Sequence, residues 1–217
     1  MIPGEPVVRW DWIAGHLDEF ARRGAQHVEL TAIAVVVGFA IAAALSLLVL
    51  RYPRTEGAIT GITGTLYTIP SLALFAILVP YTGLTVLTSE IGLVSYTLLI
   101  LIRNILRGIR DVPEEVREAA IGMGYTRRQL LWRIEVPLAL AVIIAGVRIA
   151  TVTTIGLVTV TALIGQGGFG ALILAGMLTF FSTEIIAGAA LSVGLAVLAD
   201  AWLVAVQRRL TPWTRAA

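Results

Sequence analysis

Five long runs of apolar residues alternate with short polar segments along the chain. The runs cover residues 30–50, 59–79, 91–109, 137–162 and 185–206. A helix needs roughly 20 apolar residues to cross a hydrocarbon core of about 30 Å, and each run comes close to that length or exceeds it. The pattern therefore predicts an all-α polytopic membrane protein with five transmembrane helices.

These runs divide the chain into three regions. Residues 1–29 are too polar to cross a membrane, but apolar residues recur at helical spacing from Trp10 to Phe20. We expect an extracytoplasmic interfacial helix there, or a tail packed on the protein. Residues 30–206 form the predicted transmembrane domain, and residues 207–217 form a polar C-terminal tail.

The segment after the fourth run departs from the pattern. The sequence GQGGFG predicts a flexible turn, because glycine adopts backbone conformations that other residues avoid. Residues 171–181 are apolar but too short to span, so they predict a re-entrant or interfacial helix. The turn supplies four candidate hinge or gate positions: Gly165, Gly167, Gly168 and Gly170.

Composition agrees with a membrane protein and excludes several chemistries. Hydrophobic residues make up 58% of the 217-residue chain and charged residues 14%, which is too apolar for a soluble domain of this length. All sixteen basic residues are arginine, so a lysine-dependent nucleotide-binding loop is excluded. Cysteine is absent, which excludes disulfides and thiolate sites. The two histidines, His16 and His27, are expected at the surface, and no metal site is predicted.

Arginine placement predicts the orientation of the chain. Twelve of the sixteen arginines fall in segments 51–54, 103–133 and 208–215, which the five-span pattern puts on one side. The loops at 80–90 and 165–184 contain none. Because arginine is enriched in cytoplasmic loops, we expect the N-terminus outside and the C-terminal tail in the cytoplasm.

The polar segment between the third and fourth spans predicts a helical hairpin. A capping box of Asp111 and Glu114 is expected to start its first helix. Gly124 is expected to end that helix in the left-handed conformation. Thr126 and Gln129 form a second predicted capping box, which starts the next helix. The hairpin is either a solvated loop or a docking element for a soluble partner.

The hairpin resembles the EAA motif of ABC importer permease subunits. The matching positions are Glu118, Ala119, Ala120, Gly124, Ile134 and Pro137. The resemblance implies the type I importer fold, with residues 111–137 as the coupling loop that docks on an ATP-hydrolysing subunit. It also implies a multi-pass protein of a prokaryotic plasma membrane, which is not itself an enzyme.

The same resemblance implies the partners of the chain. They are ABC ATPase subunits, an extracytoplasmic substrate-binding protein and a second permease subunit, either identical or paralogous, in contact with membrane lipid. ATP and Mg are expected in the ATPase subunit, and this chain is expected to bind no cofactor and no nucleic acid.

Other segments resemble permeases for quaternary-amine osmoprotectants, a class that includes glycine betaine, carnitine, choline and proline betaine. The matching segments are residues 68–74, 102–104, 146–150 and 162–168. One departure is Tyr67, where many relatives have glutamine. The alternatives are an ABC permease for methionine or another amino acid, and a secondary transporter or channel that needs no ATPase.

The second span contains candidate pathway residues. Pro70 removes one backbone hydrogen bond, which predicts a free Leu66 carbonyl beside Tyr67, Thr68 and Ser71. Such groups suit a quaternary ammonium, to which Tyr67 adds a cation–π contact. The alternative is a proline kink filled by hydroxyl bonds within the helix. Small residues every fourth position before the kink predict close helix packing.

Arg148 is a further pathway candidate, because a charge near mid-bilayer is costly and marks function. We expect no carboxylate at matching depth in the chain, since Asp200 is predicted near the cytoplasmic end. The guanidinium is then expected to bind carbonyls, to pair with Asp200 across a dimer, or to receive a substrate carboxylate.

Overall fold

The computed structural model describes residues 7–215, and all regular elements in that range are helices. The first and last residues of the predicted terminal tails, 1–6 and 216–217, lie outside this description. The helices are α1 (Trp10–Gly15), α2 (Leu17–Arg51), α3 (Glu56–Thr68), α4 (Ser71–Thr82), α5 (Val86–Arg110), α6 (Glu114–Gly122), α7 (Arg127–Leu130), α8 (Val136–Val160), α9 (Phe169–Thr179) and α10 (Ser182–Leu210). Short 3₁₀ turns lie at Pro53–Thr55, Thr161–Ile164 and Pro212–Arg215, and a π turn at Leu131–Glu135 joins α7 to α8.

Within residues 7–215, four helical segments are long and apolar enough to cross a membrane, and a bent pair makes a fifth if it counts as one span. The four are α2, α5, α10 and the continuous stretch Arg127–Ile164. The pair is α3 and α4, which meet at 98° beside Pro70. The predicted second span is therefore interrupted at Pro70, as expected, and its two halves form a sharply bent pair.

The N-terminal segment differs from the expected interfacial helix. Helix α2 starts at Leu17 and runs without a break to Arg51, so residues 17–29 of the polar segment continue the first span. The separate helix α1 has six residues. Trp12 packs edge-on against Phe181 at 5.2 Å, whereas Trp10 is 75% exposed. Trp12 therefore agrees with the alternative expectation, a tail packed on the protein.

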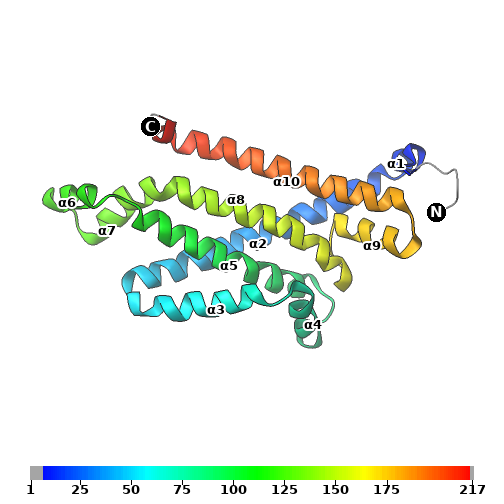
Figure 1. The fold of residues 1–217 in the computed structure, drawn as a ribbon, viewed down its shortest axis with the longest axis horizontal. Helices are drawn as coiled ribbons and strands as arrows, with labels where there is room; N and C mark the ends of the chain where they lie inside the picture. The colour runs from blue at the N-terminus through cyan, green and yellow to red at the C-terminus, as the bar shows by residue number, and fades with distance from the viewer. Residues whose placement is uncertain (1–6, 216–217) are drawn as a thin grey trace.

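Helices α2, α5 and α8 form the centre of the molecule (Figure 1). Small buried residues recur every fourth position on α2: Ala34, Gly38, Ala42 and Ser46. A Cβ at Gly38 would collide with Thr97 of α5, and one at Gly146 of α8 would lie 2.5 Å from Asn104 of α5. Small residues therefore allow the close backbone approach by which membrane helices pack.

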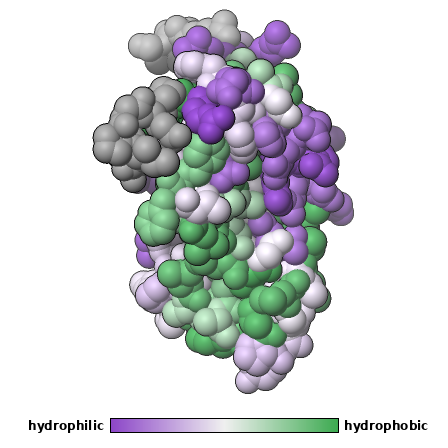
Figure 2. Space-filling view, turned by 90° about the vertical axis from the view of Figure 1, so that its right-hand side faces the viewer, coloured by the Kyte–Doolittle hydropathy of each residue, from purple (hydrophilic) through white to green (hydrophobic). Residues whose placement is uncertain are grey.

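The two ends of the molecule differ in the elements that they carry. Figure 1 places the α6–α7 hairpin, the turn between α2 and α3, and the C-terminus at one end. Helices α1, α4 and α9 lie at the other. Figure 2 looks at this second end: hydrophobic residues cover its lower part, around α4, and hydrophilic residues gather in the upper part. Leu72 and Ile77 of α4 are more than half exposed, so this short helix presents an apolar surface.

Candidate functional site

The start of the hairpin differs from the prediction. Pro113 is the N-cap of α6, and no side-chain cap is formed. Helix α5 continues to Arg110, so Asp111 closes that helix, and its carboxylate accepts a hydrogen bond from Arg107 at 3.3 Å. The predicted Asp111–Glu114 capping box is therefore wrong, because Asp111 forms the C-cap of α5 instead of the N-cap of α6.

The turn of the hairpin agrees with the prediction. Gly124 has φ +83°, and the Tyr125 N–H donates to the Ala120 carbonyl at 3.1 Å, which closes the end of α6. No heavy atom beyond the neighbouring residues would lie within 4 Å of a Cβ at Gly124, so only backbone conformation demands glycine. Thr126 and Gln129 form the predicted capping box.

The motif residues divide between an outer and an inner face. Glu118 and Ala119 are exposed, whereas Ala120 is buried. Ile134 and Pro137 are half-buried at the junction with α8. Ile121 and Met123 are 58% and 68% exposed beside them. The hairpin therefore offers an apolar outer face that the described part of the chain leaves uncovered.

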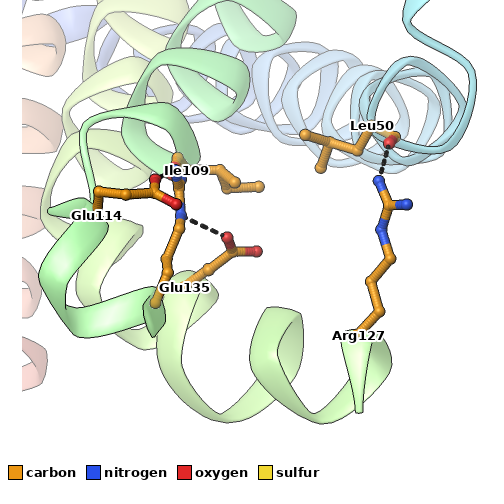
Figure 3. A network of polar contacts seen from close by, with 6 residues as sticks. Leu50, Ile109, Glu114, Arg127 and Glu135 are labelled. Carbon is orange, nitrogen blue, oxygen red and sulfur yellow. Dashed lines mark hydrogen bonds and ion pairs between the residues drawn. The ribbon is translucent and has the colours of Figure 1, made fainter. Parts of the chain in front are cut away.

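Arg117 ties the hairpin to the membrane helices. Its guanidinium donates to Glu135 at 2.9 Å, to Glu114 at 3.2 Å and to the Ile109 carbonyl at 2.6 Å (Figure 3). The side chains of Arg117 and Glu135 are only 21% and 14% exposed. The sequence alone does not indicate this contact, because the two residues are 18 positions apart. The arginine joins α6, the end of α5 and the start of α8.

We expect Arg117→Gln to loosen the hairpin. The variant leaves the half-buried Glu135 carboxylate without its cation, at a local cost of about 1–3 kcal/mol. Amides of residues 114–124 should then exchange with deuterium about tenfold faster or more. Arg133→Gln is the matched control, because Arg133 is exposed. Equal exchange in the two variants would show that the Arg117 contacts do not hold the hairpin.

The bend between α3 and α4 uses a different carbonyl from the one predicted. The Leu66 carbonyl is not free, since it accepts the Ile69 N–H at 3.3 Å. The Ile69 carbonyl instead accepts a hydrogen bond from the Tyr96 hydroxyl of α5. The Tyr67 ring packs edge-on against the Tyr96 ring at 6.0 Å. Tyr96 therefore fixes the break.

The polar candidates around the bend lie on the outer surface of the chain. Tyr67 is 39% exposed, Thr68 and Pro70 are exposed, and Ser71 is half-buried. The Thr68 hydroxyl donates to the Thr65 carbonyl at 2.8 Å, as the alternative of intrahelical hydroxyl bonds expects. Of these groups, Tyr67 contacts a residue of α5, through its ring.

The small residues of α3 do not pack within the chain. The predicted positions are Gly57, Gly61 and Thr65: a Cβ at either glycine would meet no heavy atom within 4 Å, and Thr65 is exposed. Ile62 on the same helix is 65% exposed. The expected close packing is therefore not found in the described residues, and this face of α3 is open.

Arg148 pairs with Asp200 within the chain. The two guanidinium contacts to the carboxylate are 2.9 and 3.0 Å, and Gln207 accepts a third bond at 3.4 Å. The prediction of no carboxylate at matching depth is wrong. Helix α10 continues to Leu210, so Asp200 lies ten residues, or roughly 15 Å, from its C-terminal end. Arg148 lies at a similar depth, roughly 18 Å into α8.

The glycine-rich turn is held by a buried histidine. Gly165, Gly167 and Gly168 all have positive φ, whereas Gly170 lies inside α9. The fully buried His27 ring lies 3.0 Å from the Ile155 carbonyl and accepts the Phe169 N–H at 3.3 Å. The expectation of a surface histidine is therefore wrong for this residue, because α2 extends past it. A hinge or gate role for the four glycines stays a prediction.

Comparison with known proteins identifies the family. Residues 34–212 match the family described as "Binding-protein-dependent transport system inner membrane component". The chain is 36% identical over 188 residues to the carnitine transport permease protein OpuCB of Listeria monocytogenes, which covers 86% of each chain. It is 35% identical over 187 residues to the choline transport system permease protein OpuBB of Bacillus subtilis (strain 168), with the same coverage.

A solved structure supports the fold. A chain of the inward-facing MetNI methionine ABC transporter superposes with a TM-score of 0.79 at 19% identity, over 91% of this chain and 98% of that one. The chain therefore belongs to the family of binding-protein-dependent transport system inner membrane components, the permease subunits of type I ABC importers. The hairpin is its EAA-like loop.

Proposed function

We propose that the chain is the permease subunit of an ATP-driven importer for quaternary-amine osmoprotectants of the betaine, carnitine and choline class. The main observation that supports an ATP-driven importer is the hairpin, which Arg117 fixes to the membrane helices and which has an uncovered apolar face for an ATPase. The substrates of the two relatives, named as carnitine and choline transport permeases, support the substrate class. The methionine transporter shares the fold at 19% identity, which does not favour an amino-acid substrate.

The hairpin couples an ATPase to the membrane helices in this proposal. The ATPase subunits bind ATP and Mg, and the outer face around Glu118, Ile121 and Met123 fits into their surface. Helix is continuous from Arg127 to Ile164, so movement of the hairpin is carried along α8 through Ile134 and Pro137. The Arg117 contacts link α6 to α5 and to the start of α8, so that these helices move together.

The open face of α3 and α4 meets a second permease subunit, identical or paralogous, and the pathway runs beside it. The uncovered glycines of α3 allow close approach of a neighbouring helix. Tyr67, Thr68, Pro70 and Ser71 then line the junction. The half-exposed Tyr67 ring supplies a cation–π contact to a quaternary ammonium without a fixed negative charge.

The proposed orientation puts the hairpin and the C-terminus in the cytoplasm, and an extracytoplasmic binding protein meets the other end. Single cysteines test it directly, since the chain has none of its own. Arg54→Cys and Trp213→Cys, both at exposed sites, should react only from the cytoplasmic side. Leu84→Cys, at a residue 63% exposed, should react only from outside. Labelling of Leu84→Cys and Trp213→Cys from the same face would overturn the orientation.

Co-purification tests the proposed partners. An affinity-tagged permease should retain an ABC ATPase, and Glu118→Lys should release the ATPase without releasing the second permease subunit. The reason is that the substitution reverses a charge on the exposed face of α6 alone. A permease that carries no ATPase and accumulates substrate from an ion gradient would instead be a secondary transporter.

A further inference from the structure

A cavity of about 660 Å³ opens at the cytoplasmic end of the molecule, between the end of α2 and the hairpin. Its polar lining consists of five arginines and one carboxylate: Arg51, Arg110, Arg117, Arg127, Arg128 and Glu135. Leucines from α2, α7 and the π turn and Ile109 from α5 line the rest. The cavity is therefore both strongly cationic and partly apolar.

Two of the five arginines are neutralised within the chain. Arg110 forms a two-pronged pair with Glu56 at 2.6 and 2.7 Å, and Arg117 pairs with Glu135 and Glu114. The other three, Arg51, Arg127 and Arg128, form no ion pair with any described residue. The cavity therefore holds three arginines without a carboxylate partner among the described residues, and its five arginines with Glu56, Glu114 and Glu135 carry a net charge of +2.

Two of these three arginines are held in position by contacts with uncharged groups, so their positive charge can still bind an anion. Arg127 reaches across the cavity and donates to the Leu50 carbonyl at 3.3 Å, opposite Glu114 and Glu135 (Figure 3). The Arg51 guanidinium lies 5.4 Å from the Tyr52 ring centre. A carbonyl and an aromatic ring carry no net charge, so an anion in the cavity meets two arginines already held near it.

Aromatic residues place the cavity at the depth of lipid headgroups. Tyr52 follows Arg51 directly and is 55% exposed, and Trp132 follows the lining residue Leu131 and is 53% exposed. Exposed Tyr and Trp at the ends of membrane spans lie at the membrane–water interface. The cavity therefore opens where lipid phosphates are found.

We propose that this cavity binds the headgroup of an anionic phospholipid of the cytoplasmic leaflet. The phosphodiester lies among Arg51, Arg127 and Arg128, and the glycerol and first acyl carbons lie against Leu47 and Leu50. A soluble phosphate shares the headgroup's charge but gains nothing from the leucines, so the apolar lining favours an amphiphile. The bound lipid bridges the first span to the coupling hairpin, which goes beyond the proposed transport function.

Native mass spectrometry of the whole transporter tests the proposal. The complex is released from nanodiscs of phosphatidylcholine with one quarter phosphatidylglycerol, and the retained phosphatidylglycerol is counted per permease. The variant Arg51→Gln/Arg127→Gln/Arg128→Gln should retain at least about tenfold less, because each arginine near an anionic surface contributes substantially to binding. The control Arg54→Gln/Arg133→Gln/Arg209→Gln removes equal charge at exposed sites outside the cavity and should retain as much as wild type.

Three results would overturn the proposal. Equal retention by the cavity variant and wild type shows that the arginines do not bind lipid. Loss of phosphatidylglycerol upon addition of soluble glycerol 3-phosphate shows a site for small phosphates instead. Loss of the ATPase from the cavity variant with lipid retention unchanged shows that acidic residues of the ATPase fill the cavity. None of the three readouts measures transport. The lipid proposal can therefore fail while the proposed transport function holds, and the reverse.

Discussion

Gly124→Val is expected to abolish coupled uptake while leaving membrane insertion and protein level nearly normal. Gly124 has φ +83°, and a β-branched residue held there costs roughly 1–3 kcal/mol of local strain. The backbone relieves that strain by leaving the left-handed conformation, which changes the direction of α6 relative to α7. The ATPase then meets a misplaced docking helix. Uptake and ATP hydrolysis of the reconstituted complex, with and without loaded binding protein, measure the effect.

Gly122→Val is the matched control for this prediction. Gly122 lies two residues earlier, also has open space around a Cβ, and has ordinary helical backbone conformation. The control should keep most of its coupled uptake, because valine at an ordinary helical φ carries no left-handed strain and has a higher helix propensity than the glycine it replaces. If Gly124→Val couples stimulated hydrolysis to uptake at the wild-type ratio, the hairpin is not the coupling element.

Asp200→Ala is expected to lower the amount of assembled permease strongly. Removal of one partner of a fully buried ion pair costs about 3–5 kcal/mol. The Arg148 and Asp200 side chains are 29% and 37% exposed, so the loss is smaller than for a fully buried pair. The remaining guanidinium lies deep in the membrane without a carboxylate. Fluorescence-detected size-exclusion chromatography of the detergent extract measures the assembled fraction.

The double variant Arg148→Leu/Asp200→Leu decides what the pair is for. Two apolar residues replace the pair without leaving a charge, so the assembled amount should recover, and with it the uptake of glycine betaine and choline. That result makes the pair a structural link between α8 and α10. A variant that assembles and transports choline, but not betaine, would instead show that the guanidinium receives the substrate carboxylate.

Local signals predicted the hairpin turn well. Gly124 specifies the turn of the hairpin, and Thr126 and Gln129 specify the second capping box. All of these contacts join residues that are close together in the sequence. The Asp111 cap failed because nothing local says that α5 continues to Arg110. The sequence therefore predicts where the chain turns better than where each helix begins.

Contacts between distant residues could not be predicted. Arg148 and Asp200 are 52 positions apart, and His27 meets a carbonyl 128 positions away. Such pairs depend on which helices lie side by side, and periodicity carries no information about that. Pro70 predicted a break in the second span, but the 98° bend also depends on the Tyr96 hydroxyl of another helix.

Uptake by proteoliposomes tests the proposed function most directly. The purified permease, with its ATPase subunits, is reconstituted with ATP and Mg inside, and radiolabelled glycine betaine, carnitine or choline with the binding protein is added outside. We predict accumulation of at least one of these substrates that requires internal ATP, the ATPase and the binding protein together. Accumulation that persists without ATP and follows an imposed sodium or proton gradient would contradict the assignment as an ATP-driven importer permease.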